Sequence, residues 1–125
     1  MAWIRRPRST GWQNVSTLLE PGVTGNAFLA REGQAVHFML HNLATTTAGN
    51  VNILRLPTGF IPTAVTGANW RNGAVLSDAG DVVRQLSFFA GYMRVLQMPT
   101  GKQVGGYATW IVPSDWPTSL PGVAV

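Results

Sequence analysis

Hydrophobic and polar residues alternate along much of this chain with a period of two, in short runs that glycine and proline interrupt. In the clearest run, Gln34 to Leu43, three apolar side chains are expected to share one core-facing side: Val36, Phe38 and Leu40. A period of two is that of a β-strand, and no long segment has the period of an amphipathic helix. The pattern therefore predicts an all-β protein.

The run Ala27 to Arg31 precedes that strand, and Glu32-Gly33 between them predicts a hairpin turn. Further strands are predicted at Val51 to Leu56, Asp81 to Phe89, Tyr92 to Gln97 and Val104 to Val112, with weaker candidates at Trp12 to Leu18 and Ala64 to Trp70. In "MPTGK", Pro99 and Gly101 predict the turn of a second hairpin, between the last two strong strands. Seven or eight short strands indicate an antiparallel β-sandwich or barrel, of which we favour the sandwich.

Some predicted strands are apolar on both faces. The residues concerned lie opposite the better apolar rows: Met39, Phe89, Leu96 and Ile111. A monomeric sandwich normally has polar outer faces. Either one sheet is buried against other copies in a cyclic oligomer, or β-bulges shift the phase of the strands.

Composition narrows the class of protein. The 125 residues suffice for one domain, and only 11% are charged, against about 25% in an ordinary soluble domain. Much of the surface must therefore be neutral or covered by a partner. The net charge of +4 owes three charges to Arg5, Arg6 and Arg8, so residues 1–10 are read as a basic arm before a domain spanning 11–125. No basic patch around a recognition element indicates nucleic-acid binding, and no apolar run indicates membrane insertion.

The candidate chemical groups are few. His37 and His41 would lie roughly 13 Å apart along one strand, too far to share an ion. A ring of copies of one histidine about a symmetry axis could bind a metal or an anion, but a polar contact on a half-buried strand is the simpler reading. Asp78 and Asp81, in "SDAGD", have ordinary turn chemistry. Without cysteine and without a hydrolase, zinc or phosphate-loop motif, we expect no enzyme, no metal and no cofactor.

One aromatic segment stands out as a candidate binding site. Trp70, Arg71 and Asn72 would place a ring, a fork of donors and an amide on a loop, which suits stacking on a sugar and hydrogen bonding to its hydroxyls. The alternative is that Trp70 caps one end of the sandwich core.

The C-terminal "WPTSLPG" is predicted to be a structural arm. Pro117 and Pro121 exclude a helix interior and a central strand, so the segment should be extended. Burial of Trp116 and Leu120 is expected to hold it against the domain or a neighbour.

Several motifs together resemble a known family. They are Gly11-Trp12, the hairpin Arg31 to Val36, "LPTGFIP" from Leu56 to Pro62, and "WPTSLPG" from Trp116 to Gly122. Their order resembles the C-terminal domain of minor tail, tail-fibre or receptor-binding proteins of tailed phages that infect high-GC Gram-positive bacteria. The stretch from Ala64 to Phe89 matches no pattern of that family, so no functional residue carries over.

The resemblance implies a jelly-roll-like β-sandwich head, carried as a homotrimer at the tail tip of the virion. Residues 1–10 would then be the remnant of an upstream stalk that joins other tail proteins. The leading hypothesis is a non-enzymatic adhesin domain that binds a bacterial cell-surface glycan, with avidity from three sites. The alternatives are a structural decoration or tail module that binds only other virion proteins, and a carbohydrate-binding module attached to an enzyme.

Overall fold

A computed structural model describes residues 8–62, 70–77, 83–112 and 116–125. These residues are nearly all in antiparallel β-structure, as the period of two predicts. The strands are β1 (Gln13–Asn14), β2 (Val23–Glu32), β3 (Ala35–Thr45), β4 (Gly49–Arg55), β5 (Trp70–Ser77), β6 (Val83–Phe89), β7 (Tyr92–Met98), β8 (Val104–Ile111) and β9 (Val123–Ala124). A single turn of 3-10 helix, η1 (Ser16–Leu18), follows β1.

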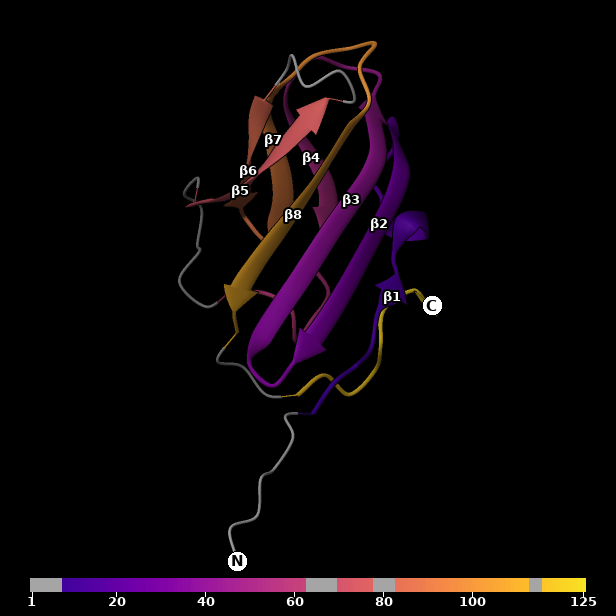
Figure 1. The fold of residues 1–125 in the computed structure, drawn as a ribbon, viewed down its shortest axis with the longest axis vertical. Helices are drawn as coiled ribbons and strands as arrows, with labels where there is room; N and C mark the ends of the chain where they lie inside the picture. The colour runs from indigo at the N-terminus through magenta and orange to yellow at the C-terminus, as the bar shows by residue number, and fades with distance from the viewer. Residues whose placement is uncertain (1–7, 63–69, 78–82, 113–115) are drawn as a thin grey trace, which may run out of the picture.

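The strands form one curled sheet in the order β4-β7-β6-β5-β8-β3-β2-β1-β9. The strands β8, β3 and β2 make one layer, and β4, β6 and β7 lie behind it (Figure 1). Strands β5, β6 and β7 pair antiparallel in sequence order, and β8 returns to pair with β5. This arrangement is a Greek key. Near the far edge Leu19 and Leu54 form a bridge, and the Glu20 amide donates to the Ile53 carbonyl at 2.9 Å, so β4 is tied back to the other side of the sheet.

The strand predictions hold best where neighbours in sequence are neighbours in space. The hairpin of β2 and β3 turns at Gly33, which has a φ of 57° that glycine adopts without strain. The predicted hairpin at "MPTGK" is wrong, because β7 pairs with β4 and β6 whereas β8 pairs with β3 and β5. Pro99 to Gly101 therefore lie in a connection between layers. The strand expected at Trp12 to Leu18 is only β1 followed by η1. Of the strand expected at Ala64 to Trp70, Ala64 to Asn69 lie outside the described residues, and Trp70 is the first residue of β5.

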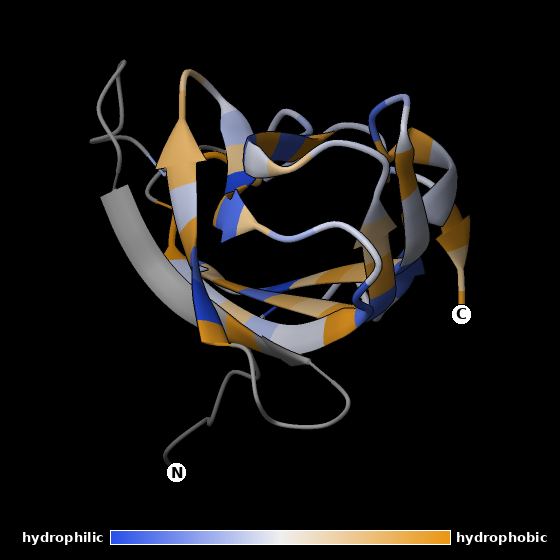
Figure 2. Ribbon diagram, turned by 90° about the horizontal axis from the view of Figure 1, so that it is seen from above, coloured by the Kyte–Doolittle hydropathy of each residue, from blue (hydrophilic) through white to orange (hydrophobic). Residues whose placement is uncertain are grey.

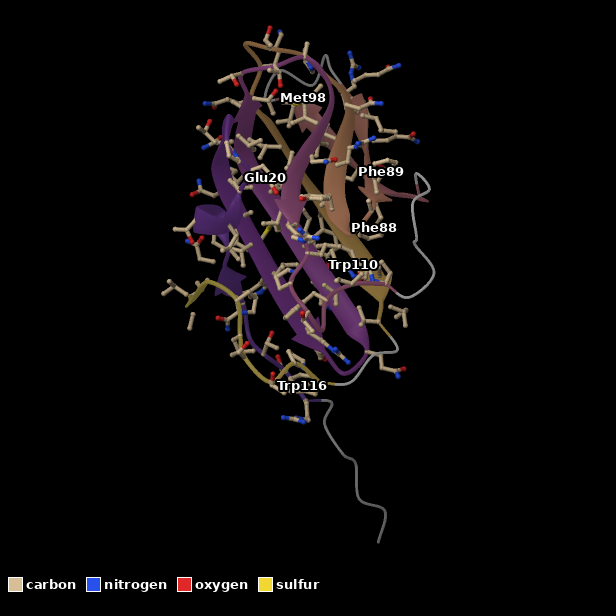
Figure 3. The ribbon with its side chains drawn as sticks, turned by 180° about the vertical axis from the view of Figure 1, so that it is seen from behind. Glu20, Phe88, Phe89, Met98, Trp110 and Trp116 are labelled. Carbon is tan, nitrogen blue, oxygen red and sulfur yellow. The ribbon has the colours of Figure 1, made fainter. Side chains whose placement is uncertain are left out.

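The core fills the space between the two layers. The alternation is visible in Figure 2, where apolar and polar residues follow one another along the strands. Phe38 is fully buried, and the Trp110 ring meets Phe88 edge-on with a centroid distance of 4.9 Å (Figure 3). The Trp110 indole N–H donates to the Phe60 carbonyl at 2.8 Å, so its polar group is satisfied inside the core.

Arg31 occupies a core position at the end of β2, where the alternation would place an apolar residue. Its side chain is 2% exposed. Its Nε donates to the Gly33 carbonyl at 2.9 Å and its Nη1 to the Gly59 carbonyl at 2.6 Å. Its guanidinium carbon lies 5.2 Å from the centre of the Trp116 ring. One cation thus connects the β2–β3 turn, the Pro57 to Phe60 turn and the C-terminal arm.

The C-terminal arm lies against the same end of the molecule. Arg8 stacks over the Trp116 ring at 4.4 Å, and Pro117 is buried against Gly59. Leu120 is 49% exposed, so the expectation that its burial holds the arm is wrong. Pro121 is half-buried, and beyond it β9 pairs with β1 at the edge of the sheet. Ring stacking, the Pro117 contact and strand pairing hold the segment instead.

Replacing Arg31 with Met tests the connection that it makes. We expect R31M to lower the free energy of unfolding by about 2–6 kcal/mol, because two carbonyls lose their donor at a cost of about 1–3 kcal/mol each. Arg84→Met is the matched control, since Arg84 also donates to two backbone carbonyls but at an exposed site, and should cost less than about 1 kcal/mol. Urea unfolding measures both, and equal losses would contradict the assignment.

The contact between Gly59 and the arm gives a second test. A Cβ at Gly59 would lie 2.8 Å from the Pro117 Cβ, whereas a Cβ at Gly91 would meet nothing within 4 Å. The two glycines have similar φ values, 89° and 84°, so the backbone strain of an alanine is matched. We expect Gly59→Ala to destabilise by about 1–3 kcal/mol more than Gly91→Ala. If thermal or urea unfolding shows no excess, the arm does not pack tightly on this turn.

Candidate binding site

A surface pocket of about 280 Å³ lies over the outer face of the β2–β3–β8 layer. Its lining comes from the N-terminal segment and from all three strands: Ser9, Gly11, Trp12, Ala30, Glu32, His37 and Tyr107. The outward positions of the strands supply the floor, because the alternate residues face the core. The pocket is therefore a feature of a sheet face, and a separate segment of chain closes one side of it.

Backbone pairing holds that N-terminal segment in place. Ser9 and Glu32 form an antiparallel bridge, and the Thr10 amide donates to the Arg31 carbonyl at 2.9 Å. The Arg31 amide in turn donates to the Thr10 hydroxyl at 2.9 Å. Gly11 then turns the chain with a φ of 65°, which brings Trp12 over the sheet.

Three rings form a row across the pocket. The centroids of Trp12 and His37 are 6.5 Å apart, and those of His37 and Tyr107 are 6.1 Å apart in a stacked arrangement. The Tyr107 hydroxyl and the His37 Nδ1 share a hydrogen bond. Trp12 is 37% exposed and Tyr107 50% exposed, so parts of both rings are open to a ligand.

The chemistry of this row is that of a binding site for a polar ring with apolar faces. Aromatic faces stack on the C–H faces of such a ring, while hydroxyl, carboxylate and imidazole groups pair with its hydroxyls. Glu32 and Ser9 provide a carboxylate and a hydroxyl at the rim of the pocket. A pyranose or furanose sugar has both kinds of surface.

The site predicted at Trp70, Arg71 and Asn72 is placed differently by the backbone. These residues are the first three of strand β5, so the expectation that they lie on a loop is wrong. Trp70 pairs with Phe88 and Arg71 with Ser87, and the register shifts between Arg71 and Gly73. Their side chains lie outside what the structure describes, so whether Trp70 is a platform or a cap stays a prediction.

The pocket residues were not combined by sequence reasoning, since they lie at positions 12, 37 and 107. Two weak signals existed. Gly11-Trp12 belongs to the motifs of the family resemblance, and His37 alternates out of the core row of β3. Tyr107 carried no signal of its own, because its place beside His37 follows from the pairing of β3 with β8.

The predicted metal and carboxylate candidates are also located. His37 is half-buried and engaged with Tyr107, while His41 is exposed further along β3. Within the part of the chain that the structure describes, no three His, Cys, Asp or Glu side chains gather to hold a metal ion. Asp78 and Asp81 lie outside the described residues.

Comparison with protein-family models, curated proteins and solved structures finds no match to this chain. In the described ranges, no helix is both long and apolar enough to span a bilayer.

Proposed function

We propose that this chain is the receptor-binding domain of a phage tail tip, a non-enzymatic adhesin that recognises a bacterial cell-envelope glycan. The pocket beside Trp12, His37 and Tyr107 carries the proposal. It offers two partly exposed aromatic rings, and Glu32 and Ser9 lie at its rim. That combination suits a sugar ring better than a purely apolar ligand.

The place in a virion rests on the resemblance to phage tail proteins. Three of its four motifs meet around one side chain: Arg31 donates to Gly59 and lies over Trp116, and Pro117 packs on Gly59. The fourth, Gly11-Trp12, follows directly on the segment paired with Arg31. The motifs thus act as one packing unit, which supports reading them as a family signature.

A jelly-roll-like homotrimer is the assembly that we propose for this domain. Ile111 is 62% exposed and Met39 39% exposed on the outer face of β3 and β8, as the two-faced pattern of these strands suggests. Met39 lies opposite Tyr107 beside the pocket, whereas Ile111 lies four residues along β8 from Tyr107. Contact with neighbouring copies at Ile111 would remove this apolar group from water and leave the ring row of the pocket open. Three pockets on one rigid head would then gain avidity on a repetitive cell surface.

The same exposed residues favour the second candidate function, a structural module that binds only other virion proteins. Ile111, Met39 and the exposed half of Tyr107 would suit a protein partner as well. The two functions differ in what the free domain binds, because only an adhesin has affinity for host cells.

Binding of the fluorescently labelled domain to host cells tests the adhesin function. Tyr107→Ala should lower binding at least tenfold, because it removes the outer ring of the pocket, whereas Thr109→Ala, exposed two residues along β8, should bind as wild type does. Removing wall polysaccharide should abolish binding by the wild-type domain.

Equal binding before and after polysaccharide removal would overturn the glycan ligand. Affinity for virion proteins without affinity for any cell would favour the structural module. If Trp70→Ala rather than Tyr107→Ala removes binding at unchanged stability, the ligand sits on the platform predicted from sequence and not in the pocket.

Light scattering during size-exclusion chromatography at micromolar concentration tests the trimer. The wild-type domain should elute with three times the chain mass of 13.5 kDa. Ile111→Asp should shift it to a monomer because it places a carboxylate in the contact, and Val83→Asp, at a 55% exposed position on β6, should leave the trimer intact. A wild-type monomer would contradict the assembly.

A further inference from the structure

The β4–β7–β6 layer carries most of the basic side chains of the described sheet. Arg55, Arg84 and Arg94 lie on these strands, whereas the one Arg or Lys on β2, β3 and β8 is the inward-facing Arg31. Among the described residues, no carboxylate forms an ion pair with Arg55 or Arg94, although nearby like charges repel. Within the described ranges this pair of cations is uncompensated, and on a surface with few charges it favours an anionic partner.

Two of these guanidiniums are held by aromatic rings of neighbouring strands. Arg94 lies 3.8 Å from the centre of the Phe89 ring, and Arg55 lies 5.3 Å from that of Tyr92. Phe89 and Tyr92 are themselves partners in the β6–β7 register. The Arg94 Nε also donates to the Asn52 side chain at 2.8 Å, so the remaining Nη donors are presented in a fixed orientation.

A buried hydroxyl in the same row points independently to a ligand. The register aligns Asn52 with Arg94, Arg94 with Ser87, and Ser87 with Arg71. Ser87 is fully buried on the face opposite Leu86 and Phe88, and its Oγ has no hydrogen-bond partner. A buried polar group without a partner is destabilising, and an ion that would pair with it is one of its ordinary explanations.

We infer that the row of Ser87 and Arg94, with Arg55 beside it, is a second binding site. Its ligand is an oxyanion, namely the phosphodiester or carboxylate group of an acidic envelope polymer. Arg94 supplies a planar fork for the oxyanion and Arg55 a second charge, and the Ser87 hydroxyl gains an acceptor. The inference deepens the proposed function and rests on its assignment of an envelope polymer as the ligand.

A nucleic acid also carries phosphodiesters, but the site suits one poorly. Single strands bind by stacking bases on open aromatic faces. Here a guanidinium covers the Phe89 ring and another lies over the Tyr92 ring. The face thus offers charge and hydrogen bonds to an anion, with little ring surface for a base.

Calorimetric titration of the domain with defined polymers tests the site. The probes are poly(glycerol phosphate), polygalacturonate, neutral dextran and single-stranded DNA. Binding of one or both of the first two, weakening as NaCl rises, is expected, and their ratio tells phosphodiester from carboxylate. Dextran should not compete, and tighter binding of DNA than of either acidic polymer would overturn the inference.

Matched charge removals separate a built site from general attraction. Arg94→Gln and Arg55→Gln should each lower the affinity for the acidic polymer at least fivefold. Arg84→Gln makes the same charge change on the same layer and should lower the affinity less than twofold. Ser87→Ala should lower the affinity without altering the charge of the domain. Equal losses in all three Arg variants would show attraction by net charge alone and sink the site.

The outcome on cells separates this inference from the proposed function. If Arg94→Gln binds host cells as tightly as wild type while Tyr107→Ala does not, the oxyanion site is wrong and the adhesin stands. If the acidic polymers bind through Arg94 but no cell binds the wild-type domain, the site stands and the adhesin is wrong. Urea unfolding of each variant confirms that the compared proteins are folded.

Discussion

The guanidinium of Arg31 joins parts of the chain that no strand ladder connects. A charge at a core position is costly unless polar groups surround it, and here the Gly33 and Gly59 carbonyls and the Trp116 ring do so. The β2–β3 turn, the turn before Phe60 and the C-terminal arm must therefore be in place together. An apolar residue could fill the volume, but it could not fix the relative positions of these three segments by directed bonds.

The same residue links stability to the pocket. The backbone amide and carbonyl of Arg31 pair with Thr10, which anchors the N-terminal segment that carries Trp12 on β2. The side chain of Arg31 fixes the end of that same strand. Anything that loosens the hairpin end would move one wall of the pocket relative to His37 and Tyr107, which stand on β3 and β8. The arm takes part through Arg8, because Arg8 stacks on Trp116 and accepts a bond from Gly33. Preorganised walls lower the entropy lost on binding.

Sequence reasoning succeeded where the deciding contacts were local. Alternation through Phe38 and a glycine turn suffice for the β2–β3 hairpin, whereas the partner of β8 depends on how the sheet curls, and Pro99 to Gly101 look the same in either case. Strand β5 was missed because Asn72 and Gly73 imitate a loop, although the register shift there accommodates them. The pocket needed three residues from β3, β8 and the N-terminal segment, a juxtaposition that only long-range pairing creates.

The small number of charges makes their placement informative. With 11% charged residues, hydrophobic burial shapes the curl of the sheet, and along the described strands the outer face of the β2–β3–β8 layer carries no guanidinium. The outer face with Trp12 and Tyr107 therefore suits uncharged groups that stack on aromatic rings. The face with Arg94 suits anionic groups. At an ionic strength of about 0.1 M, dissolved ions screen interactions between exposed charges that are more than about 10 Å apart, so each face acts on the part of a ligand that lies against it. A polymer that carries both sugar rings and acidic groups could engage both faces, whereas a purely neutral or purely ionic ligand would use half of the surface.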